Sequence, residues 1–262
     1  MSGQVGLVAE GIPFPPKVED FYLPAILEGA YPWLTKFTIL VMVAAVVLIG
    51  YFLWAYRGPA LVPTKRQWIA ESIYGFIRNS IAKDMIGHEG VAFAPYLATL
   101  FSFVLLTNLF GIIPGIQISP NSHIAFPLVL AVVSYTLFIA SGVRKHGFGK
   151  YFKHALLPPA PWYILPLLVP IEAFSTFIVR PVTLALRLFA NMFAGHMILL
   201  VFTLGGFALL NADSLFVKPI SLLSWLMAVA LTFLEVIVAI LQAYVFVVLT
   251  ASYLQGALAE EH

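Results

Sequence analysis

The 262-residue chain is 61% hydrophobic and only 10% charged, well below the roughly 25% charged share of soluble proteins. Water is therefore not its main solvent, which argues against an ordinary soluble domain. The absence of cysteine excludes a disulfide framework, a thiolate nucleophile and a Cys-based metal site. A net charge of +2 is uninformative by itself. We expect neither a cofactor nor a metal.

Three apolar runs predict ordinary transmembrane helices. Residues 37–56, 91–113 and 124–143 carry no formal charge, and each reaches the ~20 residues that span a hydrocarbon core. The first run lies in a predicted span at 34–56, and the other two form a predicted helical hairpin at 91–143. The preceding segment, 1–33, has five prolines and no basic stretch ahead of an apolar core, so it does not resemble a cleavable signal peptide.

The basic residues predict the orientation of the chain. Nine of the 14 lysines and arginines fall in two short segments: Arg57, Lys65, Arg66, Arg78 and Lys83, then Arg144, Lys145, Lys150 and Lys153. The positive-inside rule makes both segments cytoplasmic, the second as a basic loop at 144–160. The N-terminus then lies outside, and five crossings place the C-terminus in the cytoplasm. Beside spanning helices, we interpret the clustered charge as a membrane signal rather than as nucleic-acid binding.

The segment 64–86 between the first two spans is amphipathic. Its apolar residues recur at three- and four-residue spacing against charged ones: Trp68, Ile69, Ile73, Phe76, Ile77 and Ile81. This pattern predicts a helix on the cytoplasmic surface or docked on a partner. A solvated surface helix with a dry inner face fits equally well.

The last part of the chain, 161–258, predicts two helices too long for upright spans. Prolines interrupt its entry, so we expect the first helix to settle near Ile171 and to run to Leu210. After a turn at 211–219, the second runs from Ile220 to Leu258. Each would be about 60 Å long, twice the ~30 Å hydrocarbon thickness, so both must be strongly tilted. The alternative is two short helices in each element, with a break near Gly195.

These elements define the expected fold class. It is an all-α integral membrane protein with about five membrane-embedded helices and one amphipathic surface helix, the last two spans forming a long, strongly tilted hairpin. Ionisable and polar residues lie inside that hairpin: Glu172, Arg180, Arg187, Asn191, His196, Glu235 and Gln242. Ionisable groups at membrane depth cost several kcal/mol each and mostly line water paths, pair or face a partner. They are therefore candidate functional residues.

Arg187 is the strongest candidate. The 25 residues that follow it carry no formal charge, so its side chain cannot snorkel to the far interface, and arginine keeps its charge at physiological pH. It shares one helical stripe with Arg180, Thr183 and Asn191, at offsets of 0, 3, 7 and 11. The alternatives are a satisfied internal ion pair for Arg187 and snorkelling for Arg180.

Two pairs are expected at matching depths of the hairpin, because the positions of facing residues have nearly constant sums. Arg187 with Gln242 gives 429 and His196 with Glu235 gives 431, both centred on the expected turn. His196 and Glu235 form a plausible proton-relay pair, since imidazole titrates near neutrality; a lone His would more often bond a backbone carbonyl. Nine residues place Arg187 and His196 on opposite faces of an ideal helix, so both pairs cannot touch directly. Either a bend near Gly195 or water must connect one of them.

The segments Leu184-Ala-Leu-Arg-Leu-Phe-Ala-Asn-Met-Phe-Ala-Gly-His196 and Leu241-Gln-Ala-Tyr-Val-Phe246, with Glu235 seven residues before Gln242, resemble the signature of the ATP synthase subunit a family. The resemblance is strongest over 180–254. It implies a multi-pass stator subunit of the bacterial plasma membrane. It also implies partners, namely a rotating c-subunit ring, b-type peripheral stalk subunits and the remaining F-type ATP synthase.

The resemblance also implies residue roles. Arg187 matches the arginine that favours deprotonation of the ring carboxylate and blocks a leak between two aqueous half-channels. The residues that match polar positions along the pathway or beside that arginine are Asn191, His196, Glu235 and Gln242. Glu172 resembles a family glutamate whose spacing to Pro181 can differ by a residue. The His and Glu are exchanged relative to some members, and no aspartate follows the second span, so the outer entrance would use Asn108, His123 or water.

Three other functions fit the sequence less well. A self-contained proton or cation channel or transporter would also need buried ionisable groups, but it predicts an internal repeat, and we find none. An intramembrane hydrolase lacks its nucleophile and metal-binding motifs here. A purely structural scaffold leaves the cost of burying Arg187 unexplained. We therefore expect a subunit that catalyses no covalent chemistry alone, and the His–Glu pair favours H⁺ over Na⁺.

Overall fold

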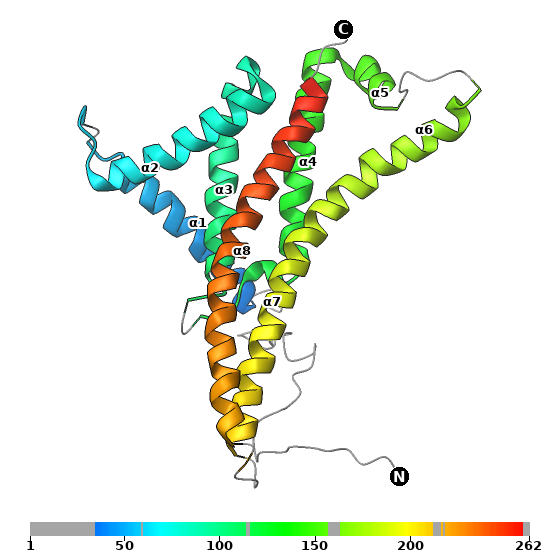
Figure 1. Cartoon of the computed structure of the whole chain (residues 1–262). Coiled ribbons are helices and arrows are strands. Elements are labelled where there is room, and N and C mark those ends of the chain that lie inside the picture. Colours follow the sequence, from blue (N-terminus) through cyan, green and yellow to red (C-terminus); the bar gives the residue numbers. More distant parts are fainter. Residues whose placement is uncertain are drawn as a thin grey trace.

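The computed structural model describes residues 35–58, 60–113, 116–156, 163–211, 216 and 218–258. The expected N-terminal segment 1–33 lies outside the described residues. All regular structure in the described part of the chain is helical, and five helical elements are long and apolar enough to cross a membrane (Figure 1). The expected all-α, multi-pass fold class is therefore confirmed.

Three of these elements have ordinary spanning length. They are α1 (Lys36–Ala55), α3 (Ala94–Leu109) with the 3₁₀ segment His88–Phe93 before it, and α4 (Ala125–His146). Thr35 caps α1, its hydroxyl accepting the backbone N–H of Thr38 at 3.4 Å. Gly147, at φ 81°, ends α4 directly after three basic residues, as expected where a helix C-terminus needs left-handed backbone and favours positive charge.

Between α1 and α3 lie α2 (Lys65–Phe76) and a π-helical continuation, Ile77–Ile86. Ile77 and Ile81 are fully buried against α3 and α8, whereas Trp68 and Ile69 are exposed. In Figure 1, this element leans away from the bundle at the end that carries the C-terminus. The predicted apolar stripe is therefore only partly covered: Ile77 and Ile81 pack inside the protein, whereas Trp68 and Ile69, nearer the start of the element, remain exposed.

The last two spans are very long. In the first, α6 (Leu165–Phe174), a π-helical turn (Ser175–Val179) and α7 (Arg180–Leu210) form one helical element of 46 residues. The second, α8 (Lys218–Leu258), has 41 residues, about 60 Å at 1.5 Å per residue. Both are about twice the ~30 Å hydrocarbon thickness and must tilt.

Two sequence-based expectations are corrected in this element. The helix begins at Leu165 rather than near Ile171, because Pro166 lies in the first turn, where its missing N–H has no intrahelical acceptor, and Pro170 is accommodated inside α6. The alternative of a break near Gly195 is wrong, because α7 is uninterrupted there. The regular pattern is interrupted earlier, at the π-helical turn.

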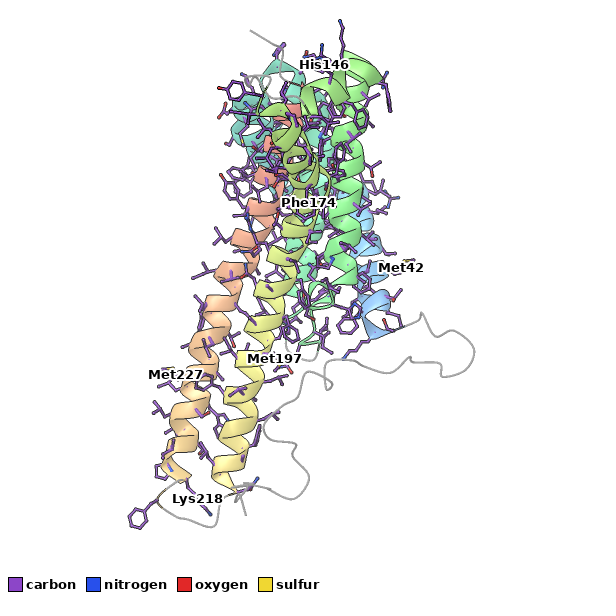
Figure 2. The ribbon with its side chains drawn as sticks, turned by 90° about the vertical axis from the view of Figure 1, so that its right-hand side faces the viewer. Met42, His146, Phe174, Met197, Lys218 and Met227 are labelled. Atoms are coloured by element: carbon purple, nitrogen blue, oxygen red, sulfur yellow. The ribbon has the colours of Figure 1, made fainter. Side chains whose placement is uncertain are left out.

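α7 and α8 lie side by side as an antiparallel hairpin, as Figures 1 and 2 show from two directions. α3 and α4 pack only against the half of the hairpin nearer the C-terminus, and the short α5 (Phe148–Leu156) follows α4. The main core joins α3, α7 and α8 through Leu97, Val104, Leu188 and Val247. Figure 2 shows the hairpin extending beyond the other helices toward Lys218.

Small residues allow the two long helices to approach closely in the extended half. A Cβ added to Gly206 would collide with the indole ring of Trp225. One turn before Gly206 on α7, the carbonyl of Phe202 accepts a hydrogen bond of 2.6 Å from the hydroxyl of Ser224, the residue next to Trp225. Without a hydrophobic drive between helices in lipid, such small-residue packing and polar contacts hold them together.

Candidate functional site

The two faces of α7 differ in chemistry. Leu184, Leu188, Met192 and His196 follow one another at four-residue spacing, and all four are buried. The stripe on the opposite side is exposed and polar, containing Thr183, Arg187 and Asn191. As the rotation argument requires, Arg187 and His196 lie on different faces of one unbroken helix.

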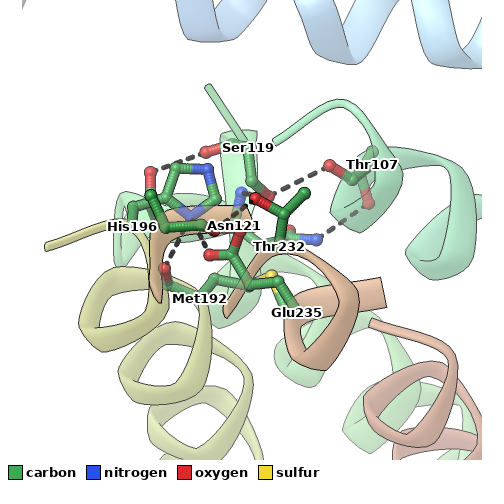
Figure 3. A network of polar contacts seen from close by, with 9 residues as sticks. Thr107, Ser119, Asn121, Met192, His196, Thr232 and Glu235 are labelled. Atoms are coloured by element: carbon green, nitrogen blue, oxygen red, sulfur yellow. Dashed lines mark hydrogen bonds and ion pairs between the residues drawn. The ribbon is translucent and has the colours of Figure 1, made fainter. Parts of the chain in front are cut away.

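The buried face brings His196 of α7 to Glu235 of α8 (Figure 3). His196 Nδ1 lies 3.1 Å from Glu235 Oε1 and 2.9 Å from the carbonyl oxygen of Met192. Both side chains are 7% exposed. The expected pair therefore meets directly, without a bend at Gly195.

The contact between the two side chains is close, but Nδ1 is directed at the Met192 carbonyl. The 3.1 Å separation meets an ion-pair distance, yet its angles do not make a hydrogen bond, so Glu235 Oε1 and Oε2 and His196 Nε2 have no hydrogen-bond partner among the described residues. Hydrogen bonds weaken steeply when misaligned, so the two side chains are close without being hydrogen-bonded to each other. The site thus combines a buried acid and a buried base, each with an uncommitted atom.

Two glycines make room for this pair. A Cβ at Gly195 would stand 2.6 Å from Glu235 Oε1. A Cβ at Gly111, just after α3, would collide with Cε1 and Nε2 of the His196 ring. The imidazole is thus enclosed by the turn that follows α3, and the carboxylate by the backbone of α7.

A polar network between α3 and α4 approaches the pair (Figure 3). The Asn121 amide donates to Thr107 Oγ1 at 2.8 Å and to Asn108 Oδ1 at 2.7 Å. Asn108 in turn donates to the carbonyl of Ala239, one turn beyond Glu235 on α8, at 3.2 Å. Ser119 donates to the Thr107 carbonyl at 3.0 Å. This network joins the α3–α4 turn to the helix that carries Glu235.

Of the two side chains considered for the outer entrance, Asn108 belongs to this network. The ring of His123 lies between Phe37 and Phe126, with centroid distances of 5.5 and 6.1 Å. Sequence reasoning missed Asn121, which is 1% exposed and keeps one buried amide oxygen without a partner among the described residues. Its signal was weak, because asparagine is common in turns.

Gln242 lies two turns from Glu235 on the same face of α8 and is buried, at 8% exposure. Among the hydrogen bonds of the described residues, none joins it to Arg187, whose side chain is on the exposed face of α7. The two are at matching positions of the hairpin but not in contact there. Arg187 therefore presents its charge outward, away from the bundle.

A second charged cluster lies near the start of α7. Arg180 Nη2 is 3.4 Å from Glu172 Oε1, and the Thr176 hydroxyl donates to the same oxygen at 3.3 Å. The Arg180 guanidinium also lies over the ring of Tyr253, 5.8 Å from its centroid. Arg180 is therefore neutralised by an internal ion pair, the arrangement that was considered above for Arg187.

The fold and site define a class: a multi-pass membrane protein that encloses a His–Glu pair in a long helical hairpin and exposes an arginine on the hairpin's outer face. The comparison with known families makes this specific, because the ATP synthase A chain family matches residues 37–255. The chain belongs to this family.

Bacterial relatives agree over nearly the whole length. The chain is 47% identical to ATP synthase subunit a of Nocardioides sp., over 97% of this chain and 96% of that one. It is 44% identical to the same subunit of Pseudarthrobacter chlorophenolicus, over 95% and 94%, and 41% identical to that of Rhodococcus erythropolis, over 94% and 91%. It is a bacterial multi-pass membrane protein.

Proposed function

We propose that this chain is the proton-translocating stator subunit of an F-type ATP synthase and that Arg187 controls proton transfer to and from a rotating c-ring. Membership of the ATP synthase A chain family supports the assignment to a proton-translocating subunit of the membrane sector. Such a subunit belongs to the membrane sector, works with the c-ring and b-type stalk subunits, and catalyses no covalent chemistry itself. Within this subunit, different residues have different roles in proton transfer.

The observation that carries the proposal is the position of Arg187, a permanent charge exposed on the apolar hairpin. In lipid, such a group costs several kcal/mol unless a partner or water receives it. The residues around it, Leu186 and Val182, are apolar and exposed as well, so the face suits an apolar protein partner that carries a carboxylate. A c-subunit ring is a partner of this chemistry, and the exposed Thr183 and Asn191 extend the same polar stripe.

His196 and Glu235 then form the outer part of the path. The pair is buried between the helices and can pass a proton, because imidazole titrates near neutrality and a carboxyl can hold a proton itself. Asn108 of α3 contacts the Ala239 carbonyl of α8, and Gln242 is buried three residues further along α8. Glu172 and Arg180 lie toward the end with the basic loop and form the inner part. Arg187 lies between the two in sequence and separates two half-channels.

The orientation follows from the same assignment. The basic residues beside α2 and at the end of α4 gather at one end of the bundle, and the Leu210 end of α7 and the Lys218 end of α8 lie at the other (Figure 1). By the positive-inside rule, the basic end is cytoplasmic and the N-terminus lies outside. Protons that drive synthesis would therefore enter by the His196–Glu235 side and leave by the Glu172–Arg180 side.

The test compares Arg187→Ala with Arg144→Ala in inverted membrane vesicles that carry the assembled complex. Arg144 lies in the last turn of α4, outside the hairpin, and serves as the matched control. We expect Arg187→Ala to abolish ATP-driven proton pumping and to alter passive proton permeability, whereas Arg144→Ala keeps both near wild type. Normal coupled transport in Arg187→Ala would reject the proposed role.

A further inference from the structure

The π-helical turn Ser175–Val179 determines which side chains of this helix meet. Glu172 and Arg180 are eight residues apart, which in a regular α-helix gives about 800° of rotation, about 80° past two full turns. A π turn closes with an i→i+5 bond and takes about one more residue per turn. With the π turn, the rotation from Glu172 to Arg180 equals that of about seven α-helical residues, or about 700°. This rotation is within about 20° of two full turns. The turn thus brings Arg180 onto the face of Glu172.

The observed contacts agree with this alignment. Arg180 Nη2 lies 3.4 Å from Glu172 Oε1, and Thr176, inside the turn, donates its hydroxyl to the same oxygen at 3.3 Å. Helical side chains lean toward the N-terminus of their helix, which is the direction in which Arg180 must reach. The charged pair therefore depends on a local irregularity of the backbone.

That irregularity leaves the carbonyl of Thr176 short of a helical donor. The Arg180 N–H, its α-helical donor, bonds Ser175 O instead. The next residue, Pro181, would be the π-helical donor but has no N–H. The hydroxyl of Tyr135 on α4 donates to the Thr176 carbonyl at 2.9 Å. A neighbouring helix thus supplies the missing hydrogen bond.

We propose that Tyr135 is a positioning residue of the inner proton path: its hydrogen bond to the Thr176 carbonyl holds the π-helical turn that keeps Glu172 paired with Arg180. The ring of Tyr135 is fixed independently, edge-on to Phe138 at 4.5 Å and to Phe177 at 6.4 Å between centroids. Its hydroxyl can therefore be removed without removing the packing. This inference rests on the proposed function, since it concerns the path that the proposed function assigns.

The first experiment measures ATP-driven proton pumping by the assembled complex carrying Tyr135→Phe. A hydrogen bond contributes about 1 kcal/mol, so we expect pumping to fall about fivefold. The control is Tyr151→Phe, a buried tyrosine of the same end whose hydroxyl has no hydrogen bond to the described residues. Pumping at the wild-type rate in Tyr135→Phe would overturn the proposal.

The second experiment separates positioning from a general structural role. Deleting Ile178, which is 50% exposed, makes Glu172 and the arginine seven residues apart in a regular helix, so they align without a π turn. In this background, Tyr135→Phe should change pumping by less than about twofold. A persistent fivefold loss would show that the hydroxyl acts in another way and would overturn the proposal.

A further variant tests the route through Glu172. If Tyr135 acts by positioning Glu172, then adding Tyr135→Phe to Glu172→Gln should give no additional loss, whereas independent effects would multiply. Multiplying effects contradict the proposal. Arg187→Ala is measured alongside. If Arg187→Ala loses pumping and Tyr135→Phe pumps normally, the inference about Tyr135 is rejected and the proposed function stands. If Arg187→Ala pumps normally, the proposed function is rejected, and with it the inference that rests on it.

Discussion

The carboxylate of Glu235 occupies the space that a side chain at position 195 would need, since a Cβ on Gly195 would stand 2.6 Å from its Oε1. Real Cβ atoms essentially never come so close, so one group must move. The α7 backbone is fixed in an uninterrupted helix. The carboxylate is therefore the group that yields.

We predict that Gly195→Ala slows proton transport although alanine is the better helix former by about 1 kcal/mol. Overpacking of about 1–3 kcal/mol would push Glu235 away from His196 and lower coupled pumping about tenfold. The control is Gly50→Ala in α1, where an added Cβ meets nothing within 4 Å. Equal pumping by Gly195→Ala and Gly50→Ala would show that proton transport does not depend on the close approach of His196 and Glu235.

Replacing His196 tests the relay itself. His196→Ala should slow proton flow through the assembled membrane sector by about 100-fold, the scale of one general acid–base group, without raising the passive leak. The expected cause is loss of a side chain that can accept and donate a proton, so the measurement is proton flux in wild-type and variant vesicles. A raised leak at unchanged coupled flux would instead assign His196 to the barrier between half-channels.

The faces on which the site residues lie could be predicted from the sequence. Helical periodicity alone places Arg187 and His196 on opposite faces and Glu235 and Gln242 on one face, and the structure has Arg187 exposed and the other three buried. The matched depth of His196 and Glu235 also follows from position sums. These are properties of regular helices, which is why they could be read from sequence.

Features that depend on irregular backbone or on distant segments could not be predicted. The π-helical turn at Ser175–Val179 leaves no periodic signal, since it is only five residues long and shifts the pattern by one residue. The contact of Asn121 with Asn108 joins a turn to the preceding helix end, and only the three-dimensional packing sets it. The prolines also made the expected start of α6 too late, because Pro166 lies in the first turn, where a helix tolerates proline.

We predict that the nearly isosteric substitution Asn121→Asp strongly lowers thermal stability. Asn121→Asp replaces the NH₂ group, which donates to Thr107 and Asn108, with an acceptor facing two oxygens. Unsatisfied buried groups cost about 1–3 kcal/mol, more when charged, so thermal stability of the purified complex's membrane sector should fall clearly. Asn79→Asp, at an exposed position, should leave it nearly unchanged. Equal melting of the two variants would argue against a structural role for the network.

Removing Lys145 should destabilise the protein more than removing its ion-pair partner Glu89. Its Nζ lies 2.7 Å from Glu89 Oε2 and also donates to the carbonyl of Leu258, the last residue of α8, at 2.9 Å. The Glu89 side chain is 56% exposed, so its contribution should be below about 1 kcal/mol. Removing the lysine instead also takes a positive charge and a donor from the C-terminus of the longest described helix.

Glu89→Gln should therefore change the midpoint of thermal unfolding of the complex little, and the change should vanish in high salt. Lys145→Met keeps the apolar stem but loses the charge, and should lower the midpoint further, with part of the loss persisting in high salt because the hydrogen bond to Leu258 is gone. Parallel melts at low and high ionic strength measure both terms. Identical shifts for the two variants, both screened by salt, would mean that the contact with α8 contributes nothing beyond the ion pair.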